Sequence, residues 1–161
     1  TRMASDVVVE DAPDRVERRS IVIDTAPDAI FDLLAAPSRH PEFDGSGTVV
    51  RARNTAPTRL SEGAKFGMSM KRFLPYAMTN HVVEFVEIET IAWRHLGRHV
   101  WRYTLEPTDD STDDSPRTKV TEEFDWRPAL VPFALKLVNY PADNAAAIEK
   151  TLVRLAGVVE S

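Results

Sequence analysis

Apolar and polar residues alternate along most of the middle of the chain, which is typical of strands that bury one face. The first such run covers residues 18–24, where Ile21 and Ile23 fall on one face and Ser20 and Asp24 on the other. Six more runs follow, over residues 48–53, 64–72, 78–87, 90–96, 99–106 and 118–126. Because no helical pattern separates these six runs, the seven strands are predicted to form one mainly antiparallel sheet.

Proline marks two of the connections between these strands. Residues 54–63 contain Pro57 and residues 73–77 contain Pro75, and Pro lacks the N–H that a central strand donates. Residues 107–117 hold four Asp and are predicted to form a long hairpin loop.

A short helix is predicted after the first strand. Pro27 suits the first helical position, where its missing N–H would be unpaired anyway. The pattern then places four apolar residues on one helical face: Ile30, Phe31, Leu33 and Leu34. Pro37 and Pro41 end the helix, and Ser38 can cap one further short turn between them.

Helical periodicity returns after Trp126 in two stretches. The first has an apolar face of Leu130, Phe133, Leu137 and Val138, and the second has one of Ile148, Leu152, Leu155 and Val159. Pro141 lies between the two stretches, so a kink or break is predicted there. The C-terminal helix is the longest apolar element available to cover one face of the sheet. We therefore expect an α+β fold in which a curved antiparallel sheet wraps around this helix and leaves an apolar cavity.

The length of the chain, 161 residues, is typical of a single domain. We expect residues 18–161 to form it and the acidic residues 1–17 to be a flexible N-terminal segment. Those first residues lack the apolar run of a signal peptide, no stretch of eighteen residues is apolar enough to span a bilayer, and there is no Cys. A cytoplasmic protein is the corresponding expectation. The net charge is −5 and Lys and Arg are scattered among acids, which argues against nucleic acid as a partner.

Five separate patches resemble the polyketide cyclase/dehydrase branch of the START-like (SRPBCC, helix-grip) superfamily. They are Ala26-Pro27-Asp28-Ala29-Ile30-Phe31, Ala36-Pro37-Ser38-Arg39-His40-Pro41-Glu42-Phe43, Ile91-Ala92-Trp93-Arg94, Trp101-Arg102-Tyr103-Thr104-Leu105-Glu106-Pro107 and Thr118-Lys119-Val120-Thr121-Glu122. The resemblance runs from about residue 18 to the C-terminus and implies a helix-grip fold with a cavity. Members of this family often carry Trp where this chain has Phe43, so the indole donor is lost there. Since the superfamily includes carriers, receptors and cyclases, the resemblance leaves the activity open.

Strand alternation selects the residues that should face the cavity, because side chains on one face of a strand recur at every second position. The candidate ligand-binding residues are Phe66, Met68, Met70, His81, Phe85, Trp93, His95, His99, Trp101, Tyr103, Glu122, Phe124, Leu137 and Tyr140. The aromatic members either line a cavity or simply pack as core, and Met suits both an adaptable wall and ordinary gap filling.

Glu122 is a carboxyl group predicted on an apolar inner face. If buried, it needs a partner or a raised pKa, as an acid or base in catalysis has; the alternative is a salt-bridged or hydrated Glu near the end of the sheet. The candidate catalytic residues are Glu122, His99 and Tyr103. His95, His99 and Glu122 could form a facial metal triad, but no metal-ligand spacing supports it, so we expect neither a metal nor a cofactor.

Three functional hypotheses follow from the sequence. The first is a carrier or sensor that binds a small hydrophobic or lipid-like molecule. The second is an enzyme that cyclises or dehydrates a polyketone or aromatic precursor in the same cavity, with one group to polarise a carbonyl and another to remove a proton. The third is a dimerising or regulatory protein with a filled cavity, so a homodimer is also considered among the partners.

Overall fold

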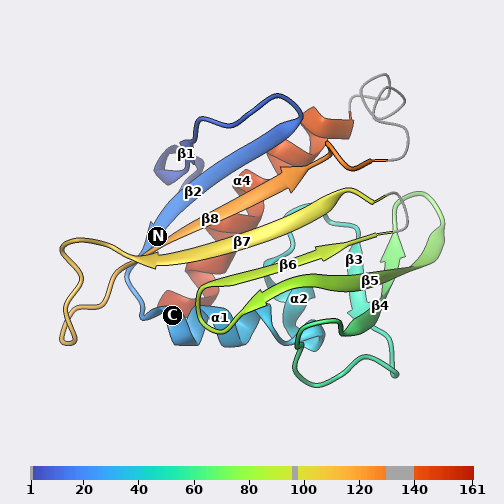
Figure 1. Cartoon of the computed structure of the whole chain (residues 1–161), viewed down its shortest axis with the longest axis horizontal. Helices are drawn as coiled ribbons and strands as arrows, with labels where there is room; N and C mark the ends of the chain where they lie inside the picture. The colour runs from blue at the N-terminus through green and yellow to red at the C-terminus, as the bar shows by residue number, and fades with distance from the viewer. Residues whose placement is uncertain (1, 96–97, 130–139) are drawn as a thin grey trace.

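The computed structural model describes residues 2–95, 98–129 and 140–161, and in this part of the chain an antiparallel sheet lies across the helix α4 (Figure 1). The strands are β1 (Val8–Val9), β2 (Val16–Ile23), β3 (Val49–Ala52), β4 (Lys65–Lys71), β5 (Pro75–Val86), β6 (Thr90–Arg94), β7 (Val100–Pro107) and β8 (Thr118–Asp125). The helices are α1 (Pro27–Leu34), α2 (His40–Phe43) and α4 (Tyr140–Glu160), with the short 3-10 turns η1 (Ala4–Asp6) and η2 (Pro37–Arg39). The predicted helix-grip-like α+β architecture is confirmed.

The strand order in the sheet is β1-β2-β8-β7-β6-β5-β4-β3, and every neighbouring pair is antiparallel. Consecutive strands from β3 to β8 pair as hairpins, as expected for a strand block without crossover helices. The long connection between β2 and β3 contains α1, η2 and α2, and these helices close one end of the sheet.

The prediction of seven strands is wrong, because the sheet has eight in the described residues. The additional strand is β1, which lies in the N-terminal segment that was expected to be flexible and pairs Val8 with Ser20 and Val9 with Arg19. The Ser20 hydroxyl also donates a 2.6 Å hydrogen bond to the Glu10 carboxylate. Two residues among acids are too few to show alternation, so the sequence pattern could not reveal this strand.

The connection predicted over residues 73–77 is also shorter than expected. β5 begins at Pro75, directly opposite Lys71 at the end of β4. Pro is tolerated there because the first residue of a strand need not donate to the ladder.

A bulge in β5 changes which residues face the helix. The register with β6 shifts between Val82 and Glu84. His81, opposite Lys65 and Arg94, therefore points to the outer face, whereas Phe85 beyond the bulge returns to the inner face. Strict alternation had placed His81 and Phe85 on one face.

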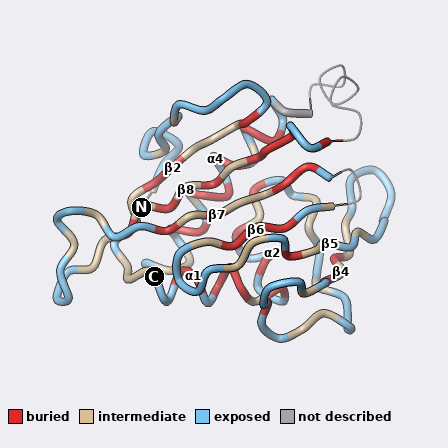
Figure 2. Tube along the Cα trace, viewed as in Figure 1, coloured by how far each residue is buried: buried red, intermediate tan, exposed pale blue. Residues whose placement is uncertain are grey.

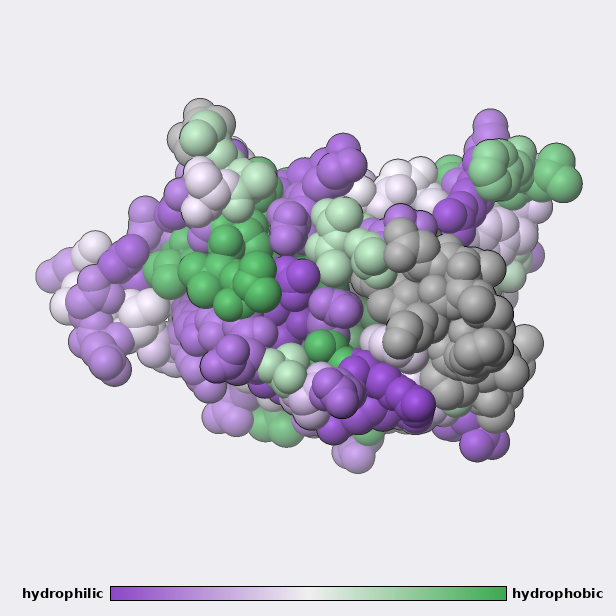
Figure 3. All heavy atoms as spheres, turned by 90° about the horizontal axis from the view of Figure 1, so that it is seen from above, coloured by the Kyte–Doolittle hydropathy of each residue, from purple (hydrophilic) through white to green (hydrophobic). Residues whose placement is uncertain are grey.

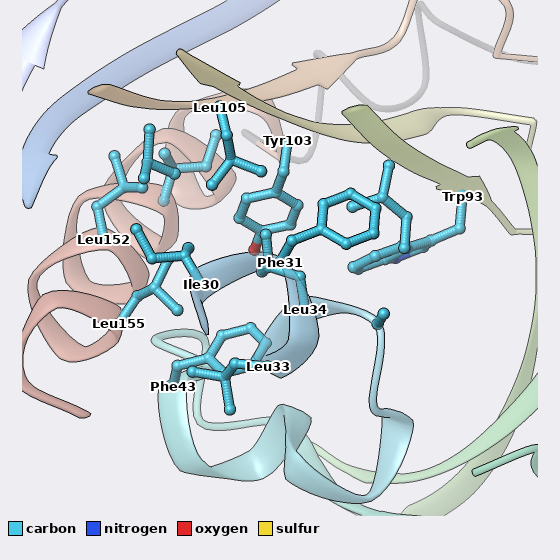
Figure 4. Close-up of a cluster of buried hydrophobic side chains, with 14 of the residues drawn as sticks. Ile30, Phe31, Leu33, Leu34, Phe43, Trp93, Tyr103, Leu105, Leu152 and Leu155 are labelled. Atoms are coloured by element: carbon cyan, nitrogen blue, oxygen red, sulfur yellow. The ribbon is translucent and has the colours of Figure 1, made fainter. Parts of the chain in front are cut away.

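The core lies between the inner face of the sheet, α1 and α4 (Figure 2). Figure 4 shows Ile30, Leu33 and Leu34 of α1 facing Leu152 and Leu155 of α4. The predicted apolar faces of both helices are therefore confirmed. The stretch with Leu130, Phe133, Leu137 and Val138 lies outside the described residues, and the described helix begins at Tyr140, so Pro141 falls in its first turn. No helix in the described ranges is long and apolar enough to cross a membrane.

Candidate functional site

A cavity of about 400 Å3 lies between the sheet, the turn after α2 and the first half of α4. Its apolar wall comes from five strands and two helices: Phe43, Val49, Phe66, Met68, Met70, Tyr76, Met78, Trp93, Trp101, Tyr103, Ala146, Ala147 and Ile148. Its polar members are His40, Asp44, Ser46, Thr48, Arg72, Asn80, His95, Glu122, Asp143, Asn144, Lys150 and Thr151, and Gly45 completes the lining.

Trp93 is the centre of the aromatic wall. The His40 ring stacks on it at 5.1 Å, Phe66 meets it edge-on at 5.6 Å, and Tyr103 lies at 5.7 Å. The His40 Nε2 donates a 2.8 Å hydrogen bond to the Leu34 carbonyl, since a carbonyl can only accept. Burial lowers the pKa of His40 to about 4, so its ring is neutral at physiological pH and serves as one more flat wall.

Close approach of backbones brings the turn after α2 against α4. A Cβ atom added at Gly45 would lie 2.5 Å from the Thr151 backbone nitrogen and 2.6 Å from the Ala147 carbonyl oxygen. The Gly45 N–H donates to the Thr151 hydroxyl at 2.8 Å. This contact fixes the position of α4 at the cavity.

Glu122 and Tyr103 are cross-strand neighbours whose side chains share the inner face. Glu122 is 1 % exposed, and this burial raises the pKa of its carboxyl to about 8; the Tyr103 hydroxyl, as a hydrogen-bond neighbour, opposes the rise, and the charge of Asp44 adds to it. Burial and the neighbouring Glu122 raise the pKa of Tyr103 well above its usual value. Near neutral pH the pair therefore presents a carboxylic acid and a phenol, both able to donate hydrogen bonds.

A second polar group lies where β6 ends and β7 begins. The Trp101 Nε1 donates a 3.0 Å hydrogen bond to His95 Nε2. Burial, with a smaller effect of His99, lowers the pKa of His95 to about 3, so the ring is neutral and carries its proton on Nδ1. That Nδ1 is buried without a partner among the described residues, as is the Oδ1 of Asn80.

Four buried polar atoms of the cavity lining have no hydrogen-bond partner in the described part of the chain. They are Asn80 Oδ1, His95 Nδ1, Glu122 Oε2 and Asn144 Nδ2. Native interiors rarely leave such atoms unpaired, because each costs the free energy of its lost hydration. The cavity is thus an apolar chamber with polar groups available to a bound molecule.

The structure brings eight of the predicted ligand-binding residues to the cavity lining: Phe66, Met68, Met70, Trp93, His95, Trp101, Tyr103 and Glu122. Four others lie elsewhere. His81 is on the outer face, Phe85 packs edge-on against Phe31 at 5.3 Å, and His99 and Phe124 pack on each other at 5.3 Å beside Trp101.

The last two predicted residues cannot be placed in the cavity. Leu137 lies outside the described residues, and Tyr140 is described only as the start of α4. No group of three His, Asp or Glu that could hold a metal ion occurs within the described residues, which include His95, His99 and Glu122.

Sequence reasoning found two of the twelve polar residues of the lining, His95 and Glu122, and missed the other ten, among them the buried His40, Asn80 and Asn144. Asn80 alternates with Met78 and Val82 along β5, and Asn144 lies one helical turn before Ile148 on the apolar face of α4. A polar residue on an otherwise apolar face was therefore a usable signal at both positions. His40 begins the one-turn helix α2, which is too short for periodicity to give an orientation.

No family model matches the chain. The chain is 36% identical over 159 residues to the uncharacterized protein Rv0088 of Mycobacterium tuberculosis strain H37Rv, covering 96% of this chain and 68% of that protein. The uncharacterized protein MT0096 of strain CDC 1551 matches with the same identity and coverage.

Solved structures share the fold at low sequence identity. A structural-genomics protein from Rhodobacter sphaeroides matches with a TM-score of 0.70 at 13% identity, covering 96% of this chain and 97% of that chain. The di-domain ARO/CYC BexL from the BE-7585A biosynthetic pathway matches with a TM-score of 0.67 at 15% identity, covering 91% of this chain and 48% of BexL. The protein KanY matches with a TM-score of 0.63 at 12% identity, over 91% of this chain and 97% of KanY. These likenesses show that the chain shares the fold of these solved proteins.

Proposed function

Since the chain belongs to the same family as the uncharacterized protein Rv0088 of Mycobacterium tuberculosis, whose name gives no activity, we propose a function from the cavity: binding of a small hydrophobic molecule that carries polar substituents. The observation that carries this proposal is the set of four unpartnered polar atoms in an aromatic chamber. The likeness to the ARO/CYC protein BexL supports placing the chain, more finely, in the polyketide cyclase/dehydrase branch of the START-like superfamily.

The size and the walls of the cavity favour a compact ligand. A volume of about 400 Å3 lies near the lower end of the range that small-molecule pockets span, about 300 to 1,000 Å3. The rings of Trp93, Trp101, Phe66 and Tyr103 offer flat apolar surfaces to a planar molecule. A planar ring system packs against these aromatic side chains better than an extended acyl chain does. A cavity of this size also argues against the hypothesis of a protein whose cavity is filled by side chains.

The polar atoms define what the ligand should carry. His95 Nδ1, Asn144 Nδ2 and the protonated Glu122 offer hydrogen-bond donors, and Asn80 Oδ1 offers an acceptor. Ketone or hydroxyl oxygens would accept from the donors, and a hydroxyl group would donate to Asn80. An oxygenated aromatic or polyketone compound has both kinds of group.

Calorimetric titration with 2-naphthol and naphthalene tests the binding proposal. We expect 2-naphthol to bind ~5- to ~13-fold more tightly, because one satisfied hydrogen bond in a dry site is worth about 1 to 1.5 kcal/mol. Asn80→Leu should remove most of this preference, whereas Thr79→Val, on the outer face of β5, should keep it. Equal affinities for the two probes in the wild-type protein would contradict the polar part of the proposal.

A cavity-filling substitution tests the location. Ala147→Trp projects an indole into the chamber and should abolish binding of both probes, whereas Ala142→Trp, at an exposed position of α4 outside the lining, should not. If both variants bound 2-naphthol as the wild type does, the ligand site would lie elsewhere.

The second candidate function is a cyclase- or dehydratase-type enzyme, and the specific observation that favours it is the raised pKa of Glu122 beside Tyr103. At neutral pH this carboxyl is protonated, so it would donate to a carbonyl oxygen and make the adjacent C–H more acidic. The base would then be another group, and the carboxylate of Asp44 lines the same cavity. Tyr103, the hydrogen-bond neighbour of Glu122, would hold this carboxyl in position, whereas His99 is not in the lining.

Turnover of a short poly-β-ketone analogue, followed by absorbance of the aromatic product, tests the enzyme hypothesis. Glu122→Gln keeps the shape and one donor but cannot transfer a proton, so we expect at least ~100-fold slower turnover with unchanged binding of 2-naphthol. Turnover by Glu122→Gln at the wild-type rate would remove Glu122 from the chemistry.

A further inference from the structure

The hairpin between β4 and β5 carries two large apolar side chains with no cover. Phe73 is 90% exposed and Leu74 is 77% exposed, the highest values among the large hydrophobic residues that are exposed in the described chain. The space-filling view shows hydrophobic atoms projecting from the end of the molecule that carries this hairpin (Figure 3). Exposing such side chains to water is costly, which marks the tip as a contact surface.

Positive charge is concentrated in the strands next to this tip. Residues 48–81 contain six Lys or Arg and one Glu, so this segment carries +5 in a chain whose net charge is −5. The description of Lys and Arg as scattered among acids therefore does not hold for this segment. Arg59 pairs with Asp32 and Glu87. The other five cations form no ion pair with a described residue; they are Arg51, Arg53, Lys65, Lys71 and Arg72.

We propose that the β4–β5 hairpin docks the protein on an anionic lipid surface, with Phe73 and Leu74 inserted at the level of the acyl chains and Lys71 and Arg72 among the headgroups. Large apolar side chains flanked by cations are the combination that interfacial membrane binding requires. Each Lys or Arg near an anionic surface adds to the attraction, whereas the rest of the chain, with a net charge of −10, is repelled by it.

The shape of the tip favours a lipid surface over a protein partner. A stable protein interface buries about 800 Å2 on each partner, with anchors seated in pockets. The tip instead offers two apolar side chains on a projecting turn of three residues between Lys71 and Pro75. The ladder that pairs Lys71 with Pro75 holds this turn in place, so little order is lost when it inserts.

The same hairpin forms part of the cavity lining. Met70, Arg72 and Tyr76 contribute to it from the strands beside the tip, and Arg72 and Tyr76 are exposed. Docking would therefore bring this end of the cavity to the lipid surface, where apolar compounds partition. The docking proposal does not depend on which ligand the cavity binds.

Co-sedimentation with vesicles tests the proposal directly. We expect the purified wild-type chain to bind vesicles of phosphatidylcholine mixed with phosphatidylglycerol, to bind pure phosphatidylcholine vesicles at least ~10-fold more weakly, and to be released by salt. The double variant Phe73→Ser/Leu74→Ser should bind the mixed vesicles at least ~10-fold more weakly. Because both side chains are exposed, this variant should keep the circular dichroism spectrum and the 2-naphthol affinity of the wild type.

Two controls separate the tip from general stickiness. Val86→Ser changes a side chain of β5 that is 47% exposed but lies at the opposite end of that strand, and it should leave vesicle binding unchanged. Lys71→Glu should weaken binding to the mixed, anionic vesicles and should leave the binding to pure phosphatidylcholine vesicles unchanged. Wild-type protein that fails to bind mixed vesicles, or a Phe73→Ser/Leu74→Ser variant that binds them equally well, would overturn the proposal. If the wild-type chain instead self-associated without binding vesicles, and the double variant did not self-associate, the tip would bind a second copy of the chain. This result would also overturn the proposal.

Discussion

The inner face of β8 carries one carboxyl among apolar neighbours, Glu122, and alternation in the sequence predicts its orientation, whereas a raised pKa is only one of the alternatives that the sequence leaves open. Alternation along residues 118–126 places it with Val120 and Phe124, and all three are buried. Its hydrogen-bond neighbour Tyr103 is its register partner on β7, which no property of one strand alone reveals. The interpretation of Glu122 as a hydrated residue near the end of the sheet is wrong, because it is 1 % exposed.

We predict that the stability of the protein falls with rising pH because of Glu122. Its pKa is about 8 when folded and near 4.5 when unfolded, so between these values the folded state holds a proton that the unfolded state has released. Its stabilising contribution is complete below pH 4.5 and is lost as the pH rises through 8, at up to ~1.4 kcal/mol per pH unit.

Urea unfolding from pH 6.5 to 9 measures this loss. The variant Glu122→Gln has no carboxyl proton to release, so its free energy of unfolding should stay flat from about pH 7.5 to 9, where the buried His residues are neutral in both states. Glu123→Gln, on the outer face of β8, is the control and should retain the decline of the wild type. Parallel curves for Glu122→Gln and the wild type would show that Glu122 is ionised in the folded protein.

His40 is predicted to matter for stability more than its position in the one-turn helix α2 suggests. His40→Leu removes the donor to the buried Leu34 carbonyl and the stacking on Trp93, which together should cost about 2 to 3 kcal/mol in urea unfolding. Arg39→Ala, one residue away, breaks an exposed ion pair with Glu42 and should cost less than about 1 kcal/mol. Similar costs for both variants would contradict the structural role of His40.

At the scale of elements, the periodicity of the sequence predicts most strands and helices. The exceptions are places where pairing with a neighbouring strand determines the local structure. The bulge at Val82 and Glu84 cannot be recognised in a run of Val, Glu and Phe, and it places His81 and Phe85 on opposite faces of the sheet. β1 exists because β2 offers it an edge, and Pro75 enters β5 because it is the first residue of the strand. Asn80 and Asn144 lie far apart in the sequence, and only the packing of α4 on the sheet shows that both line the cavity.

The contact between the turn after α2 and α4 should be very sensitive to volume. Gly45→Ala places a methyl group against the backbone of Ala147 and Thr151, so α4 must shift, and we expect a loss of about 1 to 3 kcal/mol in thermal or urea unfolding. A weaker affinity for 2-naphthol should accompany it, because α4 forms part of the cavity wall.

Gly157→Ala is the matched control on the same helix. A Cβ there meets no atom within 4 Å, and Ala favours helix over Gly, so this variant should be more stable by about 0.5 to 1 kcal/mol. If Gly45→Ala were stabilising as well, the close approach of the turn to α4 would not exist in solution.

At the scale of the whole molecule, closing the sheet over α1, α2 and α4 buries polar groups of opposite response to pH. His40, His95 and His99 have their pKa lowered by burial to about 4, 3 and 4, so each is neutral when folded but protonated when unfolded at pH 5. Glu122 has the reverse preference. The exposed carboxyls whose pKa is lowered titrate mainly below pH 4.5, so these four groups dominate the window above it.

The stability of the wild-type protein should therefore pass through a maximum between about pH 6.5 and 7. Near pH 5 the unfolded chain binds three more protons at the His residues and one fewer at Glu122, so the free energy of unfolding should fall by roughly 2 to 3 kcal/mol per pH unit on acidification. Urea unfolding at pH 7, 6 and 5 measures the slope. Glu122→Gln should make this slope steeper, because only the three His residues then contribute to it. Imidazole NMR signals should show neutral rings in the folded protein at pH 5.5. A stability that stays constant from pH 7 to 5 would mean that the folded chain accepts protons at these rings, and that the chamber they border is far wetter than its aromatic walls imply.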